Sequence, residues 1–218
     1  MYGRNQPQRN TSYAGHQHGY QQQPHARHHT IHYGAQRPLQ PPAGADPQLW
    51  NWFSTVDVDR SGSISVQELQ SALLNGNWTR FDLDTVKMLM AIFDTDRSGT
   101  IDFSEFARLW KYIAEWQNVF RHFDRDRSGY IEGHELAEAL RSFNYTLAPS
   151  LLTLIEYKYA SAPTSGYGPP PGITFDRFVR ACVVVKTLTE AFQRYDSDRD
   201  GLIQINYDQF MSIVLSTP

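Results

Sequence analysis

Residues 57–68 have the sequence DVDRSGSISVQE, and this stretch decides the fold of the chain. The same order of residue types returns at residues 94–105 (DTDRSGTIDFSE) and at residues 124–135 (DRDRSGYIEGHE). Each stretch places oxygen-bearing side chains at positions 1, 3 and 5, glycine at position 6, isoleucine at position 8 and glutamate at position 12. This spacing is typical of a helix–loop–helix calcium hand, in which the glycine permits the sharp turn that brings the oxygens inward. Three copies in the same order make the match highly specific.

The residue types in these loops suit calcium, a hard cation that takes about six to eight oxygen ligands at about 2.3–2.6 Å. Each loop offers two aspartates, a serine, the backbone carbonyl of position 7 and a bidentate glutamate. Loops two and three carry more acids at ligand positions than loop one, so we expect them to bind more tightly. At least two loops are expected to bind in the sensor range of about 10⁻⁷–10⁻⁵ M. The predicted ligands are Asp57, Asp59, Ser61, Ser63 and Glu68 in loop one, Asp94, Asp96, Ser98, Thr100 and Glu105 in loop two, and Asp124, Asp126, Ser128, Tyr130 and Glu135 in loop three.

Apolar residues at helical spacing flank every loop, which predicts an all-α protein built from helix–loop–helix hands. Loops two and three start 30 residues apart, so one long helix over residues 103–123 must serve both hands. Other helix boundaries follow from capping and stop signals. The expected boundaries are a start at Asp46-Pro47, a stop near Asn75-Gly76, a start near Asp82 or Asp84, and helices over residues 149–159 and 175–195.

The second half of the chain contains two departures from the pattern. Residues 161–172, SAPTSGYGPPPG, must form a loop, and the following Ile173 has the position of a pairing isoleucine. We interpret this as a degenerate fourth hand without calcium ligands. A fifth loop starts at residue 196 with the sequence DSDRDGLIQINY and offers Asp196, Asp198 and Asp200, but position 12 is Tyr207. We expect it to bind calcium weakly, or in a distorted form with a two-residue expansion before Phe210, and such weak sites also admit Mg²⁺.

The isoleucines at position 8 predict how the hands associate. Each belongs to a short strand that pairs with the strand of a neighbouring loop, so hand one is expected to pair with hand two and hand three with hand four. The fifth hand is left with an unpaired edge, which proteins cover. The fifth hand of a second chain would cover it, giving a two-fold dimer. The five isoleucines are Ile64, Ile101, Ile131, Ile173 and Ile203.

Composition separates a tail, residues 1–45, from the calcium-binding domain, residues 46–218. The tail is rich in Gln, Pro, Gly, His and Tyr and almost without aliphatic residues, so we expect it to be disordered. Its histidines admit transition-metal binding, but no fixed spacing recurs and compositional drift explains them as well; its Gln and Tyr content also admits partner binding or self-association.

Composition also limits the cellular compartments and the classes of partner that we expect for the protein. The formal net charge of −3 provides no basic field for nucleic acid. Cys182 is the single cysteine, which excludes an intramolecular disulfide and favours a reducing compartment. We find no secretory signal and no apolar run near the roughly 20 residues of a membrane span.

Two segments give the sequence a specific resemblance. WKYIAEWQNVFRHFDRDRSGYI, residues 110–131, and FQRYDSDRDGLIQINYDQF, residues 192–210, resemble the penta-EF-hand family. The resemblance implies a cytoplasmic calcium sensor without catalysis that forms a homo- or heterodimer through its fifth hand. It also implies binding of Pro-rich partner segments in the loaded state and recruitment to membranes or ER exit sites. In one member a partner pocket lies beside the long helix, and the matching positions here are Ile113, Trp116 and Phe143.

Three functions remain open on the sequence alone. The first is a calcium-dependent adaptor, which the aromatic residues of the long helix favour. The second is a calcium buffer or structural module that binds Ca²⁺ or Mg²⁺ without opening. The third is a non-catalytic regulatory subunit of a calpain-like protease, against which the Pro/Gln/His tail argues, since a long Gly run is expected there. No Cys/His or Ser/His/Asp arrangement indicates catalysis by the chain itself.

Overall fold

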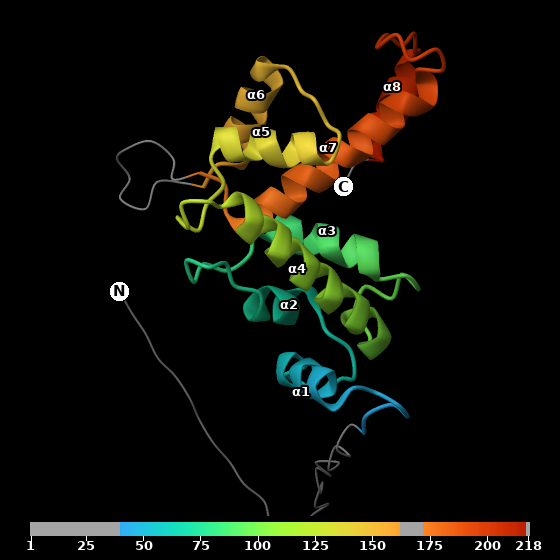
Figure 1. Ribbon diagram of the computed structural model, residues 1–218. Coiled ribbons are helices and arrows are strands. Elements are labelled where there is room, and N and C mark those ends of the chain that lie inside the picture. The colour runs from blue at the N-terminus through green and yellow to red at the C-terminus, as the bar shows by residue number, and fades with distance from the viewer. Residues whose placement is uncertain (1–39, 162–171, 217–218) are drawn as a thin grey trace, which may run out of the picture. The chain divides into compact units, whose positions relative to one another are not determined.

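The computed structural model describes residues 40–161 and 172–216. The predictions made for residues 1–39 and for the loop at 162–171 lie outside them. The described residues form helices and no extended strand, which confirms the all-α class (Figure 1). The helices are α1 (Pro47–Val56), α2 (Val66–Ala72), α3 (Leu83–Phe93), α4 (Phe103–Phe123), α5 (Gly133–Ser142), α6 (Pro149–Tyr159), α7 (Phe175–Tyr195) and α8 (Tyr207–Leu215).

Side-chain caps begin α1 and α3, the helices that lead into loops one and two. The Asp46 carboxylate accepts hydrogen bonds from the backbone N–H groups of Gln48 and Leu49, and Pro47 is the first residue of α1. Asp82 caps α3 in the same way, by accepting from the N–H of Asp84. Both starts agree with the sequence prediction, because a carboxylate satisfies N–H groups that the helix leaves unpaired.

Two helices of 21 residues, α4 and α7, each serve two consecutive hands. They pack against each other and both pack against α3, so the first pair of hands shares a core with the second. Aromatic rings fill this core: Phe120 meets Phe175 and Phe178 edge to face at centroid distances of 5.5 and 5.7 Å. The hydrophobic effect and edge-to-face ring contacts therefore hold the two pairs together.

The position-8 isoleucines pair as predicted. Ile64 and Ile101 exchange two backbone hydrogen bonds, with N···O distances of 2.8 and 2.9 Å, and so do Ile131 and Ile173. All four side chains are at most 1% exposed. Hand one therefore pairs with hand two and hand three with hand four, whereas Ile203 joins no bridge among the residues that the structure describes.

The first exit helix ends earlier than predicted, at Ala72 rather than near Asn75-Gly76. Leu73 is already extended, and the chain turns back so that Leu74 bridges Arg80. The Asn75 N–H donates to the Thr79 carbonyl at 2.8 Å, so Asn-Gly here forms the turn of a hairpin rather than the end of a helix. We call residues 73–81 the inter-hand hairpin.

Candidate functional site

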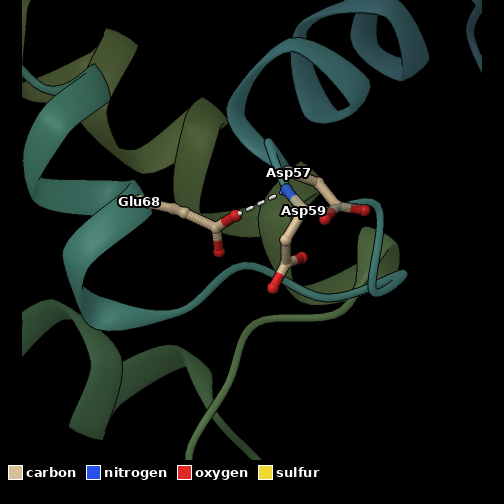
Figure 2. A group of neighbouring side chains, drawn as sticks. All are labelled: Asp57, Asp59 and Glu68. Atoms are coloured by element: carbon tan, nitrogen blue, oxygen red, sulfur yellow. Dashed lines mark hydrogen bonds between the residues drawn. The ribbon is translucent and has the colours of Figure 1, made fainter.

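Loop one brings its three predicted acids together. Carboxylate oxygens of Asp57, Asp59 and Glu68 all lie within 4.8 Å of one another. Figure 2 shows Glu68 reaching from α2 across the loop towards Asp59, where its carboxylate accepts the backbone N–H of Asp59. The same oxygen accepts the Val58 N–H at 2.9 Å, and the other oxygen accepts the Ser65 N–H at 2.9 Å. Glu68 thus closes the loop and caps the exit helix with one side chain.

The rest of loop one turns its oxygens to the same side. The Asp57 carboxylate accepts the N–H groups of Ser61 and Gly62, each at 2.9 Å. The Ser61 hydroxyl lies 2.8 Å from the Ser63 carbonyl oxygen, so the predicted ligands of positions 5 and 7 are neighbours. Gly62 has a φ of 88°, a conformation that favours glycine. All five predicted ligands of loop one therefore take part in one folded loop.

Loops two and three repeat this arrangement. The position-12 residues Glu105 and Glu135 are each 2% exposed. Glu105 accepts the Thr95 N–H at 2.7 Å, and Glu135 accepts the Arg125 N–H at 3.0 Å, which closes each loop as Glu68 closes the first. The position-5 hydroxyl again meets the position-7 carbonyl in both loops, at 3.1 Å. The acidic groups that gather within 4.8 Å are Asp94, Asp96 and Glu105 in loop two, and Asp124, Asp126 and Glu135 in loop three.

Local hydrogen bonds and burial set the carboxylate pKa values in these loops. Hydrogen bonds from the Ser61 side chain and backbone lower the pKa of Asp59, and those of Ser128 lower the pKa of Asp126. Burial raises the pKa of Asp124, and the nearby Glu135 charge raises it further. A lowered pKa keeps the carboxylates of Asp59 and Asp126 ionised. Ionised oxygens packed this closely repel one another, and a bound cation relieves the repulsion. An all-oxygen set of this kind suits calcium or magnesium rather than a soft metal.

Loop five places Asp196, Asp198 and Asp200 within 4.8 Å of one another, as expected. Position 12 is Tyr207 by count, but the structure favours the two-residue expansion over that count. Helix α8 is capped by Asn206, and its third residue, Gln209, accepts the Asn206 N–H at 2.9 Å. In loops one to three this contact belongs to the position-12 glutamate.

The structural counterpart of position 12 in loop five is therefore Gln209, two residues late. Phe210 follows it as Leu69 follows Glu68, which agrees with the two-residue expansion. Counting from position 1 missed Gln209, although the capping-box spacing from Asn206 to Gln209 was visible in the sequence. An amide carries no charge, so this loop lacks the carboxylate that closes the others.

Of the predicted partner-binding residues, Ile113 is buried in the core of this structure, and Trp116 and Phe143 are partly buried against it. Ile113 is 6% exposed, and the Trp116 ring meets Phe143 and Phe178 at centroid distances of 5.9 Å. Ile113 and Trp116 line a cavity of only about 10 Å³, which has room for roughly one water molecule. These residues are packed together and present no open groove here.

Comparisons with known proteins agree with these loops. A model for an EF-hand domain pair matches residues 48–111, and a model for an EF-hand domain matches residues 115–144. Peflin from Xenopus laevis is 40% identical over 172 residues, covering 79% of this chain and 59% of that protein. Sorcin from Schistosoma japonicum is 43% identical over 160 residues, covering 73% of this chain and 90% of that protein.

A solved structure is also similar. A homolog of programmed cell death 6 protein from Leishmania major Friedlin superimposes with a TM-score of 0.63 at 30% identity. The match covers 77% of this chain and 92% of that one. The chain spans about three-fifths of the length of the peflin from Xenopus laevis, where the match covers 59% of the relative.

Proposed function

The chain belongs to the penta-EF-hand family and binds calcium, and from that premise we propose that it is a calcium sensor and adaptor. In this proposal calcium loading exposes apolar surface, and the loaded protein then binds partner proteins. The affinity of the loops for calcium supplies the free energy for this change.

A groove in hand one carries the proposal. A cavity of about 310 Å³ lies between α1, α2 and α4, with Trp52, Val56, Ala72 and Trp110 among its lining residues. Glu68 lines the same groove. The side chain that is the predicted calcium ligand of loop one is therefore part of the groove wall, so movement of Glu68 towards an ion changes the groove directly.

The chemistry of this groove fits a Pro-rich segment. The Trp52 and Trp110 rings lie 4.9 Å apart between centroids and form an aromatic wall. Proline-rich segments hold a preformed extended helix and dock on aromatic-lined grooves at little entropic cost. We propose such segments as the partner class.

The fifth hand supports dimerisation as part of this proposal. None of the residues of α8 is buried, and Leu202, Phe210 and Leu215 are 75%, 52% and 76% exposed. This much apolar surface on one hand is a liability unless a partner covers it. We propose that the fifth hand of a second chain, identical or related, covers this surface, with Ile203 pairing to its counterpart.

We propose a cytoplasmic location with calcium-dependent recruitment to membranes or ER exit sites, as the family resemblance implies. Within the described parts of the chain, we find no helix whose length and apolarity would let it cross a membrane. Recruitment would then depend on the surface that calcium exposes. Magnesium occupancy is proposed for the weaker loop five only.

Fluorescence of an apolar-surface dye, titrated with Ca²⁺ against a constant Mg²⁺ background, tests the sensor function. We expect a saturable rise at micromolar Ca²⁺ and none with Mg²⁺ alone, and a smaller rise in Glu68→Gln. Calorimetry on the same samples measures binding independently, with Glu135→Gln expected to remove one high-affinity site. Calcium binding without a dye response would refute the sensor and leave the buffer or structural module. Copurification with a catalytic chain would favour the regulatory subunit.

A further inference from the structure

The inter-hand hairpin (residues 73–81) makes two hydrogen bonds to the second pair of hands. The Asn77 side-chain amide donates to the Tyr130 hydroxyl at 3.0 Å. The Asn75 side-chain oxygen accepts the backbone N–H of Asp176 at 3.1 Å. Asn75 and Asp176 are 6% and 1% exposed, so the second contact is sealed from water. The hairpin belongs to hand one and hand two, and it therefore joins the two pairs of hands directly.

Both contacts lie next to the β-bridge of the second pair. Tyr130 immediately precedes Ile131, and Asp176 is the second residue of α7, three residues after Ile173. Tyr130 is also position 7 of loop three, whose backbone carbonyl is a predicted calcium ligand. The hairpin thus contacts the segments next to both residues of this bridge, one of which belongs to loop three.

The Asp176 carboxylate holds Asp82, the residue that directly follows the hairpin. One oxygen accepts the Thr174 hydroxyl at 2.6 Å and the other accepts the Asp82 N–H at 2.6 Å. The Asp82 carboxylate in turn pairs with Arg177 at 3.2 Å and with Arg180 at 3.4 Å. Charge-assisted bonds of this kind are short and strong. The start of α3 is consequently fixed to the start of α7.

The other end of the hairpin leads to loop one. Leu73, 5% exposed, is the first hairpin residue and directly follows α2, the helix that carries Glu68. The Phe81 ring at the far end meets Phe175 at a centroid distance of 5.7 Å. Since packed elements move as units, a shift of α2 on ligation of Glu68 must move the hairpin or strain its contacts.

We propose that this junction couples calcium binding in loop three to calcium binding in loop one. The coupling route is α2, the inter-hand hairpin and the Ile131–Ile173 bridge, and it is separate from the long helix α4. Asn77, Tyr130 and Asp176 act as positioning residues in this route. The inference rests on calcium binding, and it does not require that calcium exposes a groove.

Nuclear magnetic resonance on the full chain tests the coupling loop by loop. The Gly62 N–H donates to Asp57 and the Gly129 N–H donates to Asp124, so each amide reports the ligation of its own loop. The measurement is the calcium midpoint of the Gly129 amide with and without the Glu68→Gln substitution. We expect Glu68→Gln to weaken loop three about fivefold, at the lower end of typical allosteric couplings.

Variants of the junction then test the route. Tyr130→Phe removes the hydroxyl that Asn77 bonds and keeps the backbone carbonyl, and Asp176→Asn weakens the bond that holds the Asp82 N–H directly after the hairpin. In the wild-type chain Glu68→Gln is expected to shift the Gly129 midpoint about fivefold. In at least one of the two junction variants this shift is expected to fall below about twofold, because the free energy of one hydrogen bond is of the same order as the whole coupling. Tyr157→Phe is the matched control, because Tyr157 is 87% exposed on α6. If Asp176→Asn does not fold, Tyr130→Phe alone decides.

Three results would overturn the proposal. One is a Gly129 midpoint that does not depend on Glu68 in the wild-type chain. Another is a dependence that both junction variants leave intact, which would assign the coupling to α4. The third is an equal loss of the Glu68 dependence of the Gly129 midpoint in the control variant Tyr157→Phe. The dye experiment is independent of all three, so failure of the sensor function and failure of the coupling give different results.

Discussion

Asp176→Ala should be the most destabilising single carboxylate substitution outside the metal loops. The carboxylate is 1% exposed and accepts two hydrogen bonds, from the Thr174 hydroxyl and the Asp82 N–H. A hydrogen bond to a charged group contributes about 1.5–3 kcal/mol, so the two together contribute about 3–6 kcal/mol. Removing a buried charge offsets part of this, so we expect the free energy of unfolding to fall by about 3 kcal/mol.

Asp176→Asn separates the contribution of the charge to the free energy of unfolding from that of the whole side chain. The amide keeps one acceptor oxygen and places an NH₂ group against the second donor, so the loss should be about 1–3 kcal/mol. Glu115→Ala is the control, since Glu115 is 63% exposed and pairs with Lys111 only at 3.9 Å. Exposed pairs of this kind contribute about 0–1 kcal/mol.

Urea unfolding of the full chain in chelator, followed by tryptophan fluorescence, measures all three variants without calcium. The slope against urea should stay constant if the variants change stability alone. An Asp176→Ala value within about 1 kcal/mol of Glu115→Ala would refute the reasoning, because two buried charged hydrogen bonds would then contribute no more than a surface pair.

Three further predictions concern the backbone, the fifth loop and pH. Gly172→Ala should lower the free energy of unfolding by about 1–3 kcal/mol, because Gly172 has a φ of 99° and an added Cβ would lie 3.0 Å from the Ile131 carbonyl oxygen. Gly76→Ala is the control in the same urea assay, because an added Cβ at Gly76 would meet no atom within 4 Å. Gln209→Glu should tighten calcium binding at loop five about tenfold by calorimetry, since it restores a charged ligand, and an unchanged affinity would contradict the assigned register. Burial raises the pKa of Tyr159 above its ordinary value of 10.0, so this residue contributes stability below pH 10 that is lost as pH rises through the folded pKa. The loss of stability with rising pH should therefore be smaller in Tyr159→Phe, as measured by chemical unfolding at several alkaline pH values.

The loop geometry could be predicted from the sequence because calcium chemistry fixes residue types at fixed spacing. Oxygen donors, glycine and glutamate must recur at set positions for one ion to be enclosed, so Glu68, Glu105 and Glu135 were identifiable without coordinates. The same holds for the pairing isoleucines. Their burial follows from the alternation of one short strand, which needs no knowledge of distant residues.

The inter-hand hairpin could not be predicted in the same way. Asn-Gly ends helices and also forms hairpin turns, and local sequence does not separate these uses. Here the choice depends on distant partners: Asn75 bonds Asp176, 101 residues away, and Asn77 bonds Tyr130, 53 residues away. These bonds exist only once the second pair of hands has folded, so tertiary structure decided the end of α2.

The fifth loop shows how a single register change separates one hand from the others. In loops one to three the position-12 glutamate bonds an N–H at position 2 and another at position 9, so one side chain ties the start of the loop to its end. In loop five the helix cap moves two residues along, and Gln209 keeps only the bond to the cap residue, Asn206, among the described contacts. The three clustered acids of this loop, Asp196, Asp198 and Asp200, are therefore not joined by a carboxylate at the position that Gln209 occupies. Neither a closing carboxylate nor β-pairing is present for α8 in the described residues, and Phe210 and Leu215 on it are 52% and 76% exposed. The register change that removes the closing carboxylate therefore occurs in the hand whose exit helix has no buried residue.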